Sequence, residues 1–213
     1  RFPAHPDAQR LIAAAETPIA APSANRSGKP SPTTANHVFE DMDGRIPLIL
    51  DGGECLVGVE STVVDMTGPV PHILRPGGIT AEQIAQVAGA SEVDSAVMRP
   101  LAEGEKPRSP GMAHRHYAPN GQLTVFTGDS DRVIQRIQSE YDCAKANGSR
   151  PLILSMEAHV ASYGDRRIES LGADETAMAH RLFALLRDAD HMEADVLFAE
   201  GVEAKGVGLA VMN

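Results

Sequence analysis

The stretch Leu123-Thr124-Val125-Phe126-Thr127-Gly128 decides how the C-terminal half of this sequence folds. Four apolar or β-branched residues that end in a Thr-Gly turn are typical of a short buried strand. A helix is expected next, because Val133, Ile134 and Ile137 recur on one helical face. The stretch therefore opens a strand-then-helix unit, the repeating element of parallel α/β folds.

The same alternation continues downstream. Two more apolar runs, Pro151–Leu154 and Val196–Ala199, are expected to be strands. Between them lies an amphipathic helix whose apolar residues recur every three or four positions: Met178, Leu182, Leu185, Leu186 and Ala189. This order predicts a small parallel α/β domain over residues 121–213.

Residues 1–99 alternate short apolar runs with glycine and proline. Strands are expected where the runs are aliphatic or β-branched, at 18–21, 47–50, 61–65 and 73–74. A helix is expected after Asp7, taken as its N-cap, and another over Thr34–Met42. Thr80 and Gln83 form a T-x-x-Q capping box that opens a third helix.

The segment 100–120 joins the two parts and is expected to be an extended linker, because proline fixes φ and removes a donor. It contains Pro100, Pro107, Pro110 and Pro119. Its three basic and two acidic side chains make it the one locally positive part of a chain whose net charge is −10.

The composition excludes several classes of protein. With 213 residues, 42% of them hydrophobic, the chain is not disordered. Its apolar runs are far shorter than the roughly 20 residues of a membrane helix. The acidic balance counts against a nucleic-acid binder, which presents a basic face. Cys55 and Cys143 form no CxxC pair, so a reduced, cytoplasmic compartment is expected.

Four segments carry side chains suited to chemistry. The first is Pro22–Thr34, where Ser23 and Asn25 offer neutral donors and acceptors to a polar ligand. Thr33 or Thr34 lies at a helix start, where N–H groups attract an anion. Because these residue types are also the ordinary residues of turns, composition alone favours a simple turn.

The second segment is Gly58–Asp65, in which Ser61 and Thr62 open a strand and can point their hydroxyls into a cleft. The alternative is a hairpin with turn glycines, which the segment in isolation favours.

The third segment places Arg75 before Pro76-Gly77-Gly78. A guanidinium on such a turn suits phosphate or carboxylate. An ion pair with a surface carboxylate is an equal alternative, and the chain contains no GxxxxGK[ST] phosphate loop.

The fourth segment, Ser109–Pro119, concentrates His114, Arg115, His116 and Tyr117, which suit a base or a phosphate. A metal site is the alternative, and we discount it because no cysteine or acidic partner stands at ligand spacing.

Together these segments and Arg1-Phe2-Pro3-Ala4-His5-Pro6 resemble, in order and spacing, the YrdC-like threonylcarbamoyl-AMP synthases in their two-domain form. The resemblance implies a twisted α/β catalytic domain with a large cleft, to which residues 1–99 contribute the C-terminal portion. It also implies a lid formed by residues 100–120 and a smaller α/β domain over 121–213.

The resemblance implies an activity: condensation of L-threonine, bicarbonate and ATP to threonylcarbamoyl-AMP and pyrophosphate, for the threonylcarbamoyl modification of tRNA. A bound Mg²⁺ would help to stabilise phosphate charge, and a tRNA-modifying transferase would take the product. The residues implied near threonine are Arg1, Ser23 and Ser61, and those implied near ATP are Asn25, Thr33, Arg75, His116 and Tyr117. No protein metal ligand and no catalytic base is implied.

The resemblance further implies on the order of a hundred residues before Arg1, with a Lys/Arg motif that contacts ATP and threonine. We therefore expect the 213 residues alone to show little activity. Two other functions remain open, namely another carbamoyl-adenylate-forming carbamoyltransferase and a non-catalytic RNA-binding module. The charge of −10 counts against stable nucleic-acid binding.

Overall fold

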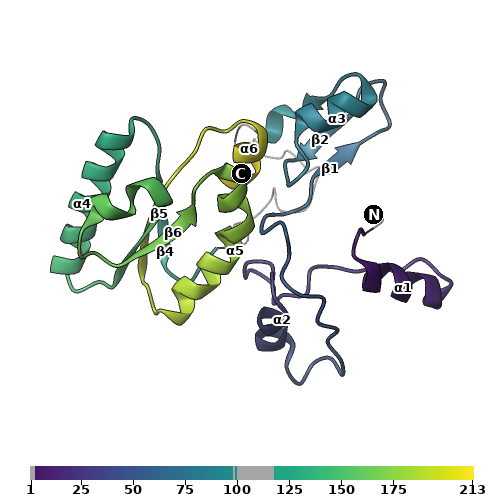
Figure 1. Ribbon diagram of the computed structural model, residues 1–213, viewed down its shortest axis with the longest axis horizontal. Helices are drawn as coiled ribbons and strands as arrows, with labels where there is room; N and C mark the ends of the chain where they lie inside the picture. The colour runs from purple at the N-terminus through teal and green to yellow at the C-terminus, as the bar shows by residue number, and fades with distance from the viewer. Residues whose placement is uncertain (1–2, 98, 100–117) are drawn as a thin grey trace, which may run out of the picture.

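The computed structural model describes residues 3–97, 99 and 118–213, which form two β-sheets with flanking helices (Figure 1). The N-terminal part contains α1 (Pro6–Ala15), α2 (Ala35–Met42), β1 (Val63–Asp65), β2 (His72–Arg75), α3 (Ala81–Ala88), β3 (Glu92–Val93) and the 3₁₀ helix η1 (Ser95–Val97). The C-terminal part contains β4 (Gln122–Phe126), α4 (Ser130–Ala146), β5 (Pro151–Met156), the 3₁₀ helix η2 (Glu157–Tyr163), β6 (Ile168–Gly172), α5 (Glu175–His191), β7 (Val196–Glu200) and α6 (Gly206–Met212).

The C-terminal sheet is parallel throughout, in the order β4-β7-β5-β6. Side chains alternate along β5, so that Leu152 and Leu154 pack in the core containing Leu185 of α5. Ile153 packs on the other face with Ile137 of α4. Figure 1 shows these two helices on opposite sides of the strands. The predicted parallel α/β fold of this part is confirmed.

The N-terminal sheet is small and mixed. β2 pairs antiparallel with β1 and parallel with β3, and α3 makes the crossover between β2 and β3. The predicted capping box opens α3: Gln83 N–H donates to Thr80 Oγ1, and Thr80 N–H donates to Gln83 Oε1. The antiparallel pairing of β1 with β2 places Arg75, at the end of β2, opposite Val63 at the start of β1.

Two strand predictions are wrong. Residues 18–21 and 47–50 belong to neither sheet, and Leu48 and Leu50 are 69% and 65% exposed. An apolar run becomes a strand only when a neighbouring strand supplies its hydrogen-bond partners. The described residues place no such strand beside either run.

Helix α1 begins one residue earlier than its predicted cap. His5, not Asp7, is the N-cap, because His5 Nδ1 accepts from Asp7 N–H at 3.3 Å. Pro6 then occupies the first turn, where its missing N–H costs nothing.

A bilayer-crossing helix, which must be long and apolar throughout, is absent from the described part of the chain.

The two parts of the chain meet at α5. Gly58 N–H donates to the carbonyl of Ala179 at 2.9 Å, and Phe183 N–H donates to the carbonyl of Gly58 at 3.4 Å. A Cβ at position 58 would overlap the carbonyl oxygen of His180, so this approach requires glycine. Residues 100–117, which make up most of the predicted linker, lie outside the described residues. The predicted division of the chain into a domain ending at residue 99, a linker and a domain beginning at residue 121 stays a prediction.

Candidate functional site

A cavity of about 590 Å³ lies where three loop segments of the N-terminal part meet α5. The apolar part of its wall includes Val59, Ile84 and, from α5, Phe183. Its polar lining consists of Ser23, Ser31, Thr33, Glu60, Ser61 and Thr62. Several hydroxyls and a carboxylate set in an apolar wall suit a small polar ligand.

Arg75, at the end of β2, supports the cavity wall from behind. Its side chain is 9% exposed, and its Nε and Nη2 donate to the carbonyl of Ser61 at 3.1 and 2.9 Å. Nη2 also donates to Ser61 Oγ at 3.1 Å and lies 3.4 Å from Glu60 Oε2. Among the described residues, the carboxylate beside Arg75 is thus Glu60, a partly buried residue of the cavity wall.

Glu60 connects two of the lining segments. Its Oε1 accepts from Ser31 Oγ at 2.6 Å, while its Oε2 faces Arg75. Gly77 closes the same cluster from the turn after β2, because a Cβ there would overlap the carbonyl of Glu60 and the N–H of Thr62. The Arg-Pro-Gly turn and the Glu-Ser-Thr segment thus pack backbone to backbone, which fixes the position of Ser61.

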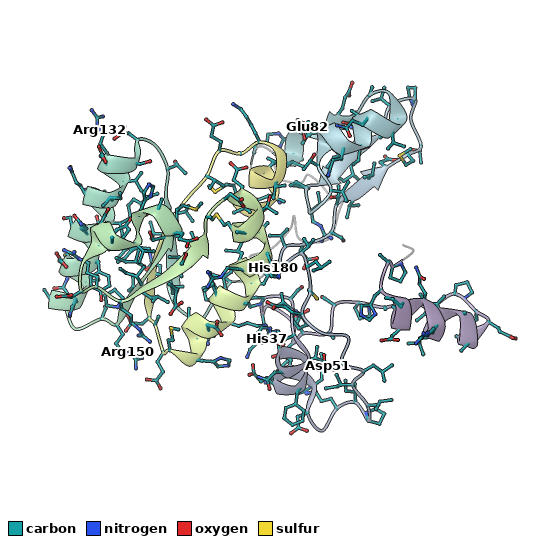
Figure 2. All side chains as sticks on the ribbon, viewed as in Figure 1. His37, Asp51, Glu82, Arg132, Arg150 and His180 are labelled. Atoms are coloured by element: carbon teal, nitrogen blue, oxygen red, sulfur yellow. The ribbon has the colours of Figure 1, made fainter. Side chains whose placement is uncertain are left out.

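Thr33 is buried just before α2, the helix that contains His37 (Figure 2). Its N–H donates to His37 Nδ1 at 3.2 Å, and its hydroxyl lies 3.3 Å from the same nitrogen. Burial, followed by the charge of Arg187, lowers the pKa of His37 and favours its neutral form. Thr34 is the N-cap, since its Oγ1 accepts from His37 N–H at 3.3 Å.

Asn25 shapes the loop that follows Ser23. Its Nδ2 donates to the carbonyls of Arg26 and Lys29 at 3.1 and 3.0 Å. Lys29 N–H also donates to the carbonyl of Arg26, and Gly28 has a φ of +90°, a conformation that glycine adopts without strain. The amide therefore closes a tight turn next to the cavity.

Of the residues expected at the site, Ser23, Thr33 and Ser61 line the same cavity. Asn25 and Arg75 lie in the segments that support this lining. Arg1, His116 and Tyr117 lie outside the described residues.

Sequence reasoning missed Ser31, Glu60 and Phe183 as residues of the cavity. Glu60 lies inside the segment Gly58–Asp65, which was singled out for its hydroxyls. Its carboxylate next to those hydroxyls could have indicated from the sequence that it belongs to the site. Phe183 lies outside the apolar stripe predicted for its helix. Phe183 nevertheless belongs to the same buried cluster as Leu185, so its side chain packs in the core and also forms part of the cavity wall.

The described residues contain no group of three or more His, Cys, Asp or Glu side chains that could hold a metal ion. Both oxygens of Glu60 already face Ser31 and Arg75. The donor set of the described part of the chain therefore does not fit a resident magnesium ion.

The sequence and the fold correspond to a known family. A family model described as "Threonylcarbamoyl-AMP synthase, C-terminal domain" matches residues 79–213, and one described as "Telomere recombination" matches residues 1–77. The first of these covers more than half of the chain. The chain belongs to the threonylcarbamoyl-AMP synthase family.

Relatives support the same assignment. The chain is 45% identical over its whole length to the threonylcarbamoyl-AMP synthases of Pyrococcus abyssi and Bacillus subtilis, and it covers 61% and 60% of them. The crystal structure of P. abyssi Sua5 complexed with L-threonine matches all of this chain, which covers 61% of that one, with 44% identity and a TM-score of 0.89. The chain thus spans about three fifths of the length of these relatives.

Proposed function

We propose that this chain carries part of the active site of an enzyme that makes L-threonylcarbamoyl-AMP and pyrophosphate from L-threonine, bicarbonate and ATP. The observation that carries the proposal is the hydroxyl-lined cavity that contains Ser23, Thr33 and Ser61. It occurs in a chain 45% identical to synthases of this name, and the similar P. abyssi structure is one of a complex with L-threonine.

The proposed reaction has two bond-forming steps. The threonine nitrogen bonds to the carbon of bicarbonate, one C–O bond of bicarbonate breaks, and a carbamate forms with the release of water. A carbamate oxygen then attacks the α-phosphorus of ATP, whose bond to pyrophosphate breaks. Such steps need orientation and charge stabilisation more than a covalent nucleophile, which suits a cavity of hydroxyls.

In this proposal Ser23 and Ser61 orient the zwitterionic threonine. Arg75 holds Ser61 in place, and its charge favours the anionic groups that develop nearby. We assign four residues to binding of the nucleotide: Asn25, Thr33, His116 and Tyr117. Arg1 is assigned to binding of threonine. Any Mg²⁺ would arrive with the ATP phosphates, since the described residues form no cluster to hold it.

The product is proposed to pass to a transferase that modifies tRNA, in the cytoplasm. The two exposed free thiols, Cys55 and Cys143, are typical of a reducing compartment.

The test is release of pyrophosphate from ATP by a protein that contains these 213 residues together with the segment expected before Arg1, since the 213 residues alone are expected to show little activity. Threonine and bicarbonate are each omitted in turn. We expect release to need both, and Ser61→Ala to raise the KM for threonine. Ser139→Ala, an exposed serine of α4, is the matched control and should change neither constant. Pyrophosphate release that does not depend on threonine, or that requires carbamoyl phosphate in place of threonine and bicarbonate, would contradict the proposal.

A further inference from the structure

Arg187, on α5 of the C-terminal part, reaches the loop that contains Ser23 and Asn25. Its side chain is 4% exposed. Nε and Nη2 donate to the carbonyl of Pro30 at 3.1 and 2.7 Å, and Nη2 donates to Asp41 Oδ2 at 2.6 Å. A residue more than 140 positions away in the sequence thus forms the hydrogen bonds at the end of this loop.

Asp41, on α2, continues the connection to the middle of the loop. The same Oδ2 accepts from Arg26 N–H at 3.1 Å, and Oδ1 lies 3.7 Å from Lys29 Nζ. The loop is therefore tied at two points, at Arg26 through Asp41 and at Pro30 through Arg187. Asn25 bridges the residues between them.

The pair is charged although it is buried. Burial alone would raise the pKa of Asp41, but hydrogen bonds from Arg187 and from Arg26 N–H lower it below its ordinary value. A buried ion pair adds little net stability compared with apolar residues of similar size. What such a pair does provide is a defined geometry, here the shape of the loop beside the cavity.

A neighbouring residue of α5 touches the cavity itself. Phe183 lies one helical turn before Arg187 and forms part of the cavity wall. Gly58, which also borders this wall, is hydrogen-bonded to the same helix. One turn of α5 therefore supplies part of the wall and also contacts the loop.

We propose that Arg187 is a positioning residue for substrate binding: with Asp41 it holds residues 23–31 in the conformation that accepts threonine and ATP. The inference rests on the proposed function and gives the C-terminal domain a part in it. Arg187 contacts no substrate in this proposal, and it acts through Pro30 and Asp41.

The test uses the same longer protein, with the segment expected before Arg1, and three variants. Arg187→Met removes the donors with little change of volume, Arg187→Lys keeps the charge, and Arg187→Met with Asp41→Leu replaces the pair by apolar side chains. Arg136→Met, on the exposed side of α4, is the control. We expect Arg187→Met and the double variant to raise the KM for threonine or ATP by about 10- to 100-fold, and Arg187→Lys to recover part of the loss.

Hydrogen exchange of residues 23–31 separates this inference from the proposed function. We expect the Arg26 N–H to lose protection in Arg187→Met and in the double variant, whether or not the chain makes pyrophosphate. A double variant that folds, keeps this protection and has the original KM values overturns the positioning role. If the longer protein shows the protection change but no threonine-dependent reaction, the tether is supported and the proposed function is refuted.

Discussion

Arg75 donates three hydrogen bonds to Ser61, two to its carbonyl oxygen and one to its hydroxyl. Both residues lie in segments that sequence reasoning singled out separately. The contact explains why an arginine precedes the Pro-Gly turn: a planar fork can hold a carbonyl and a hydroxyl at once, whereas a lysine ammonium cannot reproduce that geometry.

Arg75→Lys should therefore impair catalysis although it keeps the charge. We expect kcat/KM for threonine to fall by about 10- to 100-fold, since one lost charge-assisted hydrogen bond costs about 1.5–3 kcal/mol. Steady-state pyrophosphate release measures this effect. Arg45→Lys, in an exposed loop, is the control. An Arg75→Lys enzyme as active as the unsubstituted one would show that the fork geometry is dispensable.

Gly58→Ala should destabilise the contact between the two parts of the chain. Its Cβ would overlap the carbonyl of His180, and overpacking of this kind costs about 1–3 kcal/mol. Urea unfolding of the full chain measures the free energy. Gly68→Ala is the matched control, because its nearest neighbour would be at 3.8 Å, an ordinary contact. Equal stability of the two variants would disprove the close approach.

The contact between Glu200 and Tyr163 should make the free energy of unfolding depend on pH in the alkaline range. Its buried carboxylate accepts from Tyr163 Oη at 2.6 Å and from Ser155 Oγ at 3.0 Å. Burial and the hydrogen bond to Glu200 raise the pKa of Tyr163. The unfolded chain then releases this proton first, so the free energy of unfolding should fall as the pH rises above about 10.

Tyr163→Phe tests this response. It should cost about 1–3 kcal/mol at neutral pH, because Glu200 loses a donor, and it should flatten the alkaline fall in stability. Denaturant unfolding at pH 8 to 11 gives both values. An unchanged alkaline slope would mean that Tyr163 does not contribute to it.

The burial of His37 should make the free energy of unfolding depend on pH in the acid range. Burial, and then Arg187, lower its pKa, so the folded state prefers the neutral ring. This contribution is fully present above the unfolded pKa of about 6.5 and is lost as the pH falls through the folded value. We expect His37→Asn, whose amide oxygen can still accept from Thr33 N–H, to weaken the loss of stability below pH 6.5. Unfolding titrations at several pH values would reveal an unchanged slope if this assignment is wrong.

The sequence alone determined most of the local structure of the C-terminal part. Strands β5 and β7 are nearly continuous apolar runs because they are buried on both faces, and the apolar period of α5 indicated its core-facing stripe. Strand β6 was missed, because Ile168–Gly172 mixes polar and apolar residues. Helix α6 was missed because glycine, twice in seven residues, is a poor helix former.

Only the tertiary structure decided which of these residues meet. The apolar runs at 18–21 and 47–50 carry a strand pattern, but a pattern cannot supply the neighbouring strand that pairing requires. Motifs indicated Ser23, Thr33 and Ser61, whereas the bond from Ser31 to Glu60 and the bond from Arg187 to Asp41 join residues 29 and 146 positions apart. Local periodicity reflects the backbone of one element, while a site is made by the packing of elements that are distant in sequence. That packing placed a helix of the C-terminal domain against the cavity.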